Sequence, residues 1–418
     1  MPRSALLACT TLTVAAAVLA TTGLPAHSAL AEPQRHQQGQ PQRHHDVIDP
    51  GLQSRIAQRM SRATAGHYGF VVDIANVGRV ASLSPGMPMR PASTQKLFTT
   101  LPLLLNRADE MLTTDVVVAK APVDGVVAGD LVVRSSGDPS LVKNDLGYLA
   151  RHVRGAGVTR VTGRLVLDIG SLPTNTRQPG WKWEFVPGDI GPLSPFPVDR
   201  DWWRTDKSYV AHPTLPNLDL LRKRLVHNGV RIMGEDAIVR STAAAVVLAS
   251  HSSVSMRGLI TQTLRWSDNF YAESLLAVVG GHTPVNSTAR AAGVTDSSSA
   301  TDGSGLSYDD RETARGEVTL LDYASSSSAA TNLRHAMALA CNRGTLRHRF
   351  CNTNGANMVY AKTGTLSHTA ALAGYTKDAL GRWVTFAVIA GGVRNTYAAE
   401  KAIDRAVLVL RNYRGSQG

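Results

Sequence analysis

The stretch RPASTQKLFTT, residues 90–100, places Ser93 and Lys96 three positions apart, directly after Pro91-Ala92. Leucine and phenylalanine side chains recur at helical spacing after Lys96, and a proline suits the position before a helix. Residues i and i+3 share a helix face, so the lysine amine can reach back toward the serine hydroxyl. The pattern therefore predicts either an ordinary polar helix start or a nucleophile with its base.

Ser267-Asp268-Asn269 is a second short motif with two readings. A serine hydroxyl can pass a proton between a base and a leaving amine, and an amide two residues later can orient a peptide carbonyl. The alternative is a helix cap, which these residue types favour.

Lys362-Thr363-Gly364-Thr365 is the third motif. It offers a cation, a small residue for close backbone approach, and two hydroxyls. Such a set suits a substrate carboxylate, and a strand N–H can serve an oxyanion. The alternative is an exposed strand edge.

The three motifs occur in the order S-x-x-K, S-D-N and K-T-G, the signature of class A β-lactamases and penicillin-binding proteins. The sequence resembles the low-molecular-mass class C penicillin-binding proteins, which are D-alanyl-D-alanine carboxypeptidases. The resemblance covers about residues 65–413 and is carried by PASTQKL, GDLVVRSSGDPSL, VTGRLVLD, PGWKWE, SDNFYAESLL, DGSGLS (302–307), GTLRHRF (344–350) and AKTGTLSHTAALAGY (361–375).

The resemblance implies an α/β (α+β) serine DD-peptidase/β-lactamase-like fold, with a sheet flanked by helices and a β-rich insertion. It also implies a serine-type D-Ala-D-Ala carboxypeptidase, with DD-endopeptidase activity as a second reaction. Its substrates would be peptidoglycan stem peptides ending in D-Ala-D-Ala, and β-lactams would be covalent inhibitors. No motif indicates a cofactor, a metal or a nucleic-acid partner.

Roles for individual residues follow from the same resemblance. Ser93 would be acylated, Lys96 would be its base, and Ser267 would relay the proton. Asn269 would hold the substrate, and its carboxylate end would be bound by Lys362, Thr363 and Thr365. The backbone N–H groups of Ser93 and Thr365 would form the oxyanion hole. Independently of the resemblance, a base at Lys96 must be neutral part of the time, through desolvation or a neighbouring cation, and Lys362 is the candidate cation.

Two other functions fit the same fold. A class A β-lactamase needs a Glu followed four residues later by Asn, between the first two motifs. Glu110, Glu184 and Glu235 are the candidates, and Thr114, Gly188 and Val239 stand four residues after them, so none fits. A non-catalytic wall-binding module is the other alternative, and the intact set of three motifs argues against it.

The order of segments predicts a discontinuous catalytic domain. Residues 1–31 resemble a secretory signal, with Arg3 before an apolar stretch and Ala29-Leu30-Ala31 as the cleavage site. Residues 32–50 are predicted to be a flexible leader. Residues 51–115 and 251–418 would form the transpeptidase-like domain, and residues 116–250 would be inserted β-rich material.

Composition fits an exported globular protein. Hydrophobic residues make up 43% and charged residues 18% of the 418 residues, and the net charge is +12. The apolar stretch of the signal is too short for a good membrane span, so no stable membrane anchor is expected. The protein would be extracellular, periplasmic or cell-wall associated. Its basic charge either attracts anionic wall polymers and membrane surfaces or is diffuse.

Cys341 and Cys351 remain after removal of the signal, and in an exported protein such a pair is most simply a disulfide. A metal site is the alternative, but CNRGTLRHRFC lacks a second ligand pair at finger-like spacing.

Local patterns predict several further elements. Residues 68–83 read as a hairpin around Asn76-Val77-Gly78, residues 256–280 as helical, 372–392 as two strands and 398–413 as an amphipathic helix. Asp138 is predicted to be a turn residue, and Trp181 and Trp183 to be core residues.

Overall fold

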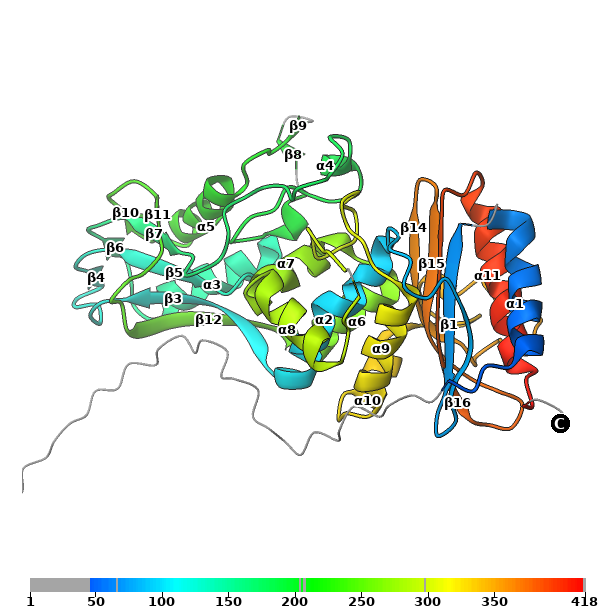
Figure 1. Cartoon of the computed structure of the whole chain (residues 1–418). Helices are drawn as coiled ribbons and strands as arrows, with labels where there is room; N and C mark the ends of the chain where they lie inside the picture. The colour runs from blue at the N-terminus through cyan, green and yellow to red at the C-terminus, as the bar shows by residue number, and fades with distance from the viewer. Residues whose placement is uncertain (1–45, 65–66, 203, 206–207, 297, 416–418) are drawn as a thin grey trace, which may run out of the picture. The chain divides into compact units, whose positions relative to one another are not determined.

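The computed structural model describes residues 46–64, 67–202, 204–205, 208–296 and 298–415 (Figure 1). The predicted signal, residues 1–31, lies outside them, as does most of the predicted leader. At the described end of the leader, Asp46 bridges Arg79, and the Val47 N–H donates to the Arg79 carbonyl at 2.8 Å. The chain is therefore tied to the sheet before the predicted end of the leader at residue 50.

The central sheet is built from both ends of the chain. Its six strands are antiparallel in the order β13-β14-β15-β16-β1-β2, and β1 pairs with β16 so that Tyr68 faces Ala390. The strands are β1 (Tyr68–Ile74), β2 (Gly78–Leu83), β13 (Ala338–Leu339), β14 (Tyr360–Leu366), β15 (Thr369–Lys377) and β16 (Trp383–Gly391). Both predicted hairpins, at 68–83 and 372–392, are confirmed.

Helices cover both faces of this sheet (Figure 1). Helices α1 (Pro50–Thr64) and α11 (Thr396–Arg411) lie on one face. The other face carries the 3-10 turn η1 (Ala92–Thr94) and the helices α2 (Gln95–Asn106), α6 (Met256–Trp266), α7 (Asn269–Val279), α8 (His282–Ala291), α9 (Ala314–Ser325) and α10 (Ala330–Ala336).

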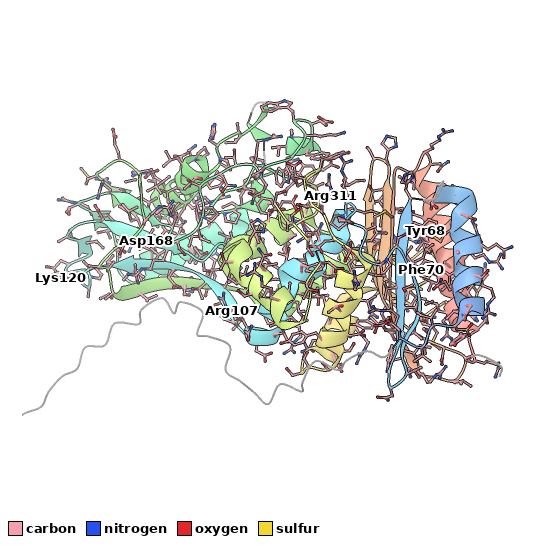
Figure 2. The ribbon with its side chains drawn as sticks, in the orientation of Figure 1. Tyr68, Phe70, Arg107, Lys120, Asp168 and Arg311 are labelled. Atoms are coloured by element: carbon pink, nitrogen blue, oxygen red, sulfur yellow. A yellow bond between two sulfur atoms is a disulfide. The ribbon has the colours of Figure 1, made fainter. Side chains whose placement is uncertain are left out.

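The two-residue period of strand β1 explains this layering. Phe70 and Val72 pack with α1 and α11, whereas Val71 between them packs with the helices of the opposite face. Tyr68 and Phe70 stack with ring centroids 6.4 Å apart, and both are labelled in Figure 2. Every residue of β1 is buried, which suits an inner strand covered on both sides.

The inserted segment has its own sheets and its own core. A mixed five-stranded sheet has the order β11-β7-β5-β3-β12, and a smaller sheet has the order β10-β6-β4. The strands are β3 (Met111–Val118), β4 (Val126–Val127), β5 (Leu131–Ser135), β6 (Arg160–Val161), β7 (Leu165–Asp168), β8 (Arg204–Thr205), β9 (Ser208–Tyr209), β10 (Arg231–Ile232), β11 (Ala237–Val239) and β12 (Val246–Ser255). The larger sheet thus begins before residue 116 and ends after residue 250.

The insertion also contains helices that the sequence reading did not include. Helices α3 (Lys143–Gly155) and α5 (Thr214–His227) pack against its sheet, with short turns at α4 (Phe185–Gly188) and η2 (Asp199–Asp201). The expected short strands are present, so the insertion is β-rich with two added helices. Among the helices of the described residues, none is long and apolar enough to cross a membrane.

Two aromatic residues of the insertion differ from each other. The prediction that Trp183 is a core residue is wrong, because its side chain is 81% exposed. Trp181 is half-buried and packs beside Phe185. Asp138 is buried and accepts hydrogen bonds from the Ser140 N–H and hydroxyl, as a turn residue does.

Candidate active site

Ser93 and Lys96 lie where the 3-10 turn η1 passes into helix α2. Ser93 is half-buried and Lys96 is fully buried. The Lys96 Nζ donates a hydrogen bond to Ser93 Oγ at 2.9 Å. Once Nζ loses a proton it can instead accept the hydroxyl proton over the same distance, which is the geometry of a nucleophile and its base.

The segment Ser267-Asp268-Asn269 connects two helices and directs two side chains to the same place. Helix α6 ends at Trp266, and Ser267 takes a left-handed conformation with φ 60°. Asp268 caps helix α7 by accepting from the Tyr271 N–H, and its carboxylate pairs with Arg200 at 2.9 Å. The helix-cap interpretation therefore holds for Asp268, while the residues on either side of it contact the two lysines.

Each neighbour of Asp268 binds a different lysine. Asn269 Oδ1 accepts from Lys96 Nζ at 2.8 Å, and Ser267 Oγ accepts from Lys362 Nζ at 2.8 Å. The Asn269 amide also donates to the carbonyl of Asp189 in the insertion at 3.2 Å. The structure thus forms two hydrogen-bonded groups, Ser93–Lys96–Asn269 and Ser267–Lys362, which lie close enough for the two lysines to repel each other.

Strand β14 supplies the third motif, and its hydroxyls have other partners. Thr363 Oγ1 donates to Thr345 Oγ1 at 2.8 Å, and Thr365 Oγ1 donates to Glu400 Oε1 on α11 at 2.6 Å. Neither hydroxyl is bonded to Ser93, Lys96 or Lys362. Their predicted role in binding a substrate carboxylate would require these bonds to be exchanged, and it remains a prediction.

Glycine is required where strand β14 passes the nucleophile. A Cβ on Gly364 would lie 2.6 Å from the Pro91 carbonyl oxygen, so a side chain there would push the strand away from Ser93.

A loop of the matched segment DGSGLS, for which the sequence predicts no role, completes the Lys96 site. Ser304 lies in DGSGLS, and its carbonyl accepts from Lys96 Nζ at 2.5 Å. The next residue, Gly305, has φ +80°, and a Cβ there would lie 1.8 Å from the Ala92 carbonyl oxygen. The loop is therefore packed directly against the turn that carries Ser93. The glycines of DGSGLS were the available sequence signal for this close approach.

Burial shifts the titration of both lysines. It lowers the pKa of Lys96 to about 8, although the nearby carboxyls of Asp302 and Glu273 act in the opposite direction. Burial also lowers the pKa of Lys362 well below its usual value, and repulsion from Lys96 adds to this shift. Of the two predicted causes of a neutral Lys96, desolvation and a neighbouring cation, burial is therefore the leading one.

Buried carboxyl groups surround the Lys96 side of the site. Burial raises the pKa of Glu273 to about 8 and that of Asp310 to about 9, with the neighbouring Asp302 adding to both shifts. Near pH 7 each of these carboxyls therefore places less negative charge beside Lys96 than an exposed carboxylate would.

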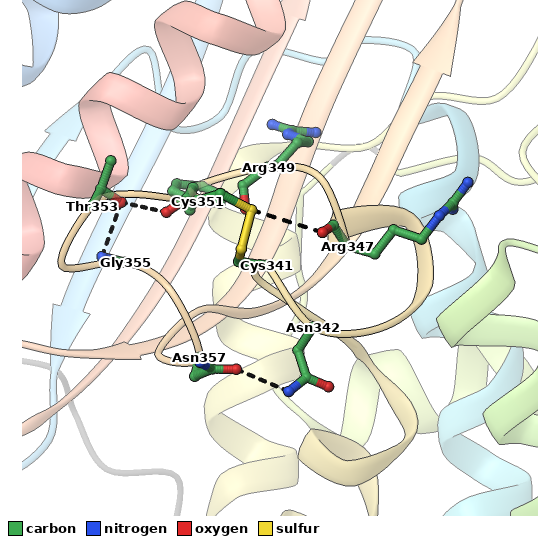
Figure 3. Close-up of a disulfide and its surroundings, with 9 residues drawn as sticks. Cys341, Asn342, Arg347, Arg349, Cys351, Thr353, Gly355 and Asn357 are labelled. Atoms are coloured by element: carbon green, nitrogen blue, oxygen red, sulfur yellow. Dashed lines mark hydrogen bonds between the residues drawn. A yellow bond between two sulfur atoms is a disulfide. The ribbon is translucent and has the colours of Figure 1, made fainter.

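The predicted cysteine pair is bonded in the structure. Cys341 and Cys351 form a disulfide across a sequence separation of 10 residues (Figure 3). The loop that it closes contains η3 (Gly344–Leu346), whose Thr345 binds Thr363 of the third motif. The loop that the disulfide closes therefore contacts strand β14 next to Lys362, through the bond between Thr345 and Thr363.

Comparisons with known proteins agree with this geometry. The sequence profile of the D-Ala-D-Ala carboxypeptidase 3 (S13) family matches residues 51–206 and 204–413. Carboxypeptidase DacB of Mycolicibacterium smegmatis is 29% identical over 399 residues, covering 87% of this chain and 84% of that protein.

Solved structures share the fold at low identity. The crystal structure of penicillin-binding protein 4 from Haemophilus influenzae aligns with a TM-score of 0.77 at 20% identity, covering 86% of this chain and 99% of the other. A predatory endopeptidase from Bdellovibrio bacteriovorus, acylated by penicillin G and bound to an immunity protein, aligns with a TM-score of 0.54 at 17% identity. That alignment covers 81% of this chain and 90% of the other.

Proposed function

The chain belongs to the D-Ala-D-Ala carboxypeptidase 3 (S13) family and is a serine-type D-Ala-D-Ala carboxypeptidase, and we propose that it hydrolyses peptidoglycan stem peptides through an acyl-enzyme on Ser93. The observation that carries the assignment to Ser93 is its hydrogen bond to Lys96, 2.9 Å long. Lys96 has a pKa of about 8, so a useful fraction of its amine is neutral near pH 7.

In the first step, the Ser93 hydroxyl gives its proton to Lys96 while Oγ attacks the carbonyl carbon of the penultimate D-alanine. The backbone N–H groups of Ser93 and Thr365 would stabilise the oxyanion that forms. The peptide C–N bond then breaks, and the proton passes to the leaving amine of the terminal D-alanine. Ser267 would relay that proton: its oxygen accepts from Lys362 Nζ at 2.8 Å, so its own hydroxyl hydrogen can be donated to the leaving amine. Lys362 would then resupply Ser267, and the proton on Lys96 would return to Lys362.

Binding of the substrate would use the groups around this bond. Asn269 has an amide next to both Lys96 and the Asp189 carbonyl, so it would orient the peptide. Lys362 would bind the terminal carboxylate with the hydroxyls of Thr363 and Thr365. The incoming carboxylate would favour the charged form of Lys362 and so offset its lowered pKa. Water would then hydrolyse the ester on Ser93.

The same attack on a β-lactam carbonyl would leave a penicilloyl ester on Ser93. Slow hydrolysis of that ester is expected, because none of the three glutamates between the first two motifs is followed by an Asn four residues later. Glu110 is bound by Arg107 at its carboxylate, and Glu184 is exposed. A chromogenic β-lactam therefore distinguishes this proposal from a β-lactamase, since rapid and repeated turnover would favour the β-lactamase.

Cleavage of cross-links is proposed as a second reaction at the same site. A cross-link and a terminal D-Ala-D-Ala both present a D-alanyl peptide bond to Ser93, and the Bdellovibrio protein of the same fold is called an endopeptidase. Export across the cytoplasmic membrane, through the signal at residues 1–31, is part of this proposal because peptidoglycan lies outside that membrane.

The decisive experiment measures D-alanine released from a peptide ending in D-Ala-D-Ala, with Ser93→Ala as the control. We expect release by the wild type and none above background by the variant. Equal rates would favour a wall-binding module. Digestion of purified peptidoglycan, followed by mass spectrometry, then separates loss of one alanine from the splitting of cross-linked dimers.

A further inference from the structure

One of the hydrogen-bond partners of Lys96 Nζ is a backbone carbonyl, and its position is set by residues outside the three motifs. The Ser304 carbonyl accepts from Nζ at 2.5 Å, and Ser304 lies in the loop of residues 302–307. Asp302 organises this loop by accepting from the N–H groups of Ser304, Gly305 and Ser307. Asp302 is itself completely buried. The position of the Ser304 carbonyl therefore depends on what holds Asp302.

Trp181 of the insertion provides one such contact. Its Nε1–H donates to Asp302 Oδ2 at 2.7 Å. The Trp181 ring also packs in a small apolar cluster with Phe185 of the insertion and with Leu306 of the loop. The N–H bond and the ring contact therefore join the same two segments.

Gln178 provides a second and separate contact. Its amide donates to Glu273 Oε2 at 3.1 Å, and Glu273 Oε1 accepts from the N–H groups of Gly303 and Ser304. The Gln178 carbonyl oxygen in turn accepts from the Asn175 amide at 3.2 Å. Glu273 is thus held from the insertion on one side and holds the loop on the other.

The backbone of the insertion meets the loop between these two side chains. The Tyr308 N–H donates to the Gly180 carbonyl at 3.2 Å. A Cβ on Gly180 would lie 2.1 Å from Ser307 Oγ, so the two segments leave no room for a side chain there. The insertion therefore contacts the loop through Gln178, Gly180 and Trp181, and the side chains that they meet at Asp302 and Glu273 are buried.

We propose that Trp181 and Gln178 are positioning residues for Lys96, and that through them the insertion sets the environment of the catalytic base. This inference rests on the proposed function, in which Lys96 takes the proton of Ser93. It gives the insertion a part in the reaction although no side chain of Trp181 or Gln178 touches Ser93 or Lys96.

The expected direction follows from the groups that face Lys96. Those with an electrostatic effect are the carboxyl groups of Asp302, Glu273, Asp268 and Asp310, and the ammonium of Lys362. Loosening the loop would admit water to Nζ, which raises the pKa of Lys96, and would weaken the carboxylate interactions, which lowers it. Burial is the larger of these effects, so the pKa should rise.

The test uses the matched substitutions Trp181→Phe and Trp183→Phe in the full chain. Both remove one indole N–H, but Trp183 is 81% exposed and does not contact the loop through it. The rate constant for acylation by a fluorescent penicillin is measured from pH 6 to pH 10. For Trp181→Phe we expect the rising limb to move to higher pH by about half a unit to one unit. The rate at pH 7 should then fall about three- to tenfold and recover at high pH.

Gln178→Ala is the second variant and should shift the limb in the same direction, which keeps the test informative if Trp181→Phe does not fold.

Superimposable profiles for Trp181→Phe and Trp183→Phe would overturn the inference. So would an equal loss of rate at every pH, because a general weakening of the structure would produce that result. The wild type separates this failure from failure of the proposed function. If mass spectrometry finds no penicilloyl adduct on Ser93 of the wild type, the proposed function fails first.

Discussion

Lys96 and Lys362 are both completely buried, yet the two pockets are built differently. Lys96 Nζ is bonded to Ser93, Asn269 and the Ser304 carbonyl, with carboxyl groups close behind. Lys362 Nζ is bonded to the Ser267 hydroxyl and to the Thr363 carbonyl of its own strand. The first pocket suits the proposed exchange of a proton between Lys96 and Ser93. The second leaves a buried amine whose charge would be best stabilised by an incoming anion.

The segments that support the two pockets also differ. The Lys96 pocket is backed by loop 302–307, which the insertion contacts through Trp181 and Gln178. The Lys362 pocket is backed by the loop that the disulfide closes, through the bond between Thr345 and Thr363. A perturbation of either support should therefore affect one lysine more than the other.

The largest effect is expected from Lys96→Met. Without a base beside Ser93, the rate of acylation should fall by about a thousandfold or more for every substrate, since general bases contribute about 10²–10⁴-fold. Lys223→Met, in an exposed salt bridge of the insertion, is the control. Acylation is followed with a fluorescent penicillin, and a variant that still reacts at a tenth of the wild-type rate would exclude Lys96 as the base.

The pH dependence of the wild type tests the same pocket. Lys96 accepts a proton only when neutral, so acylation should increase as the pH rises through the pKa of about 8. Below that pH the rate should fall about tenfold per unit, because the neutral fraction falls by that factor. A rate that is flat between pH 6 and pH 9 would contradict the assignment of Lys96.

A smaller and more selective loss is expected from Lys362→Met. If this lysine binds the terminal carboxylate, kcat/KM should fall about a hundredfold for a D-Ala-D-Ala peptide acid. The loss should be much smaller for the peptide amide, which lacks the carboxylate and is a poor substrate of the wild type. Equal losses of kcat/KM for the acid and the amide would show that Lys362 contributes to the acylation step and does not bind the terminal carboxylate.

The chain's motifs made one part of this site predictable. Ser93, Lys96, Ser267, Asn269 and Lys362 belong to short patterns whose order is specific, and the structure brings them together. The supports of the two lysines lie in or beside other matched segments, DGSGLS, PGWKWE and GTLRHRF, but no residue type in those segments indicated a supporting role. A backbone carbonyl such as that of Ser304 has no side-chain signature, and its position depends on contacts between distant segments.

The fold shows the same division between strong and weak local signals. The apolar runs in residues 372–392 predict two strands, and the structure has β15 and β16 there. Helix α3 is absent from the β-rich prediction for the insertion, although Leu146, Leu149 and Val153 recur at helical spacing. The exposed Trp183 was misjudged because its residue type is usually buried, and only tertiary contacts distinguish it from Trp181.

Removal of the disulfide should weaken the support of Lys362 more than that of Lys96. For Cys341→Ser with Cys351→Ser, the free energy of unfolding should fall by about 2–3 kcal/mol in the chain-entropy model. Denaturant unfolding measures this loss, and a reductant should affect the wild type but leave the double variant unchanged. The rising limb of the acylation profile, which reports the Lys96 pocket, should stay where it is in the wild type. A shift of that limb to higher pH in the double variant would show that the loop closed by the disulfide also supports Lys96.

The smallest effect is expected at Glu400 on helix α11, whose carboxylate binds the Thr365 hydroxyl. Thr365 donates its hydroxyl to the Glu400 carboxylate at 2.6 Å, so a substrate carboxylate arriving at Thr365 must compete with a like charge. Glu400→Gln keeps an acceptor for the hydroxyl and removes the charge. KM for a D-Ala-D-Ala peptide should fall about two- to threefold at low salt, with kcat unchanged, as is typical of a partly exposed charge interaction. The difference should shrink at high salt because ions screen such interactions.

Glu235→Gln, on the exposed surface of the insertion, is the control. A higher KM for Glu400→Gln would mean that Glu400 assists binding by holding Thr365, and the carboxylate would then bind away from this hydroxyl.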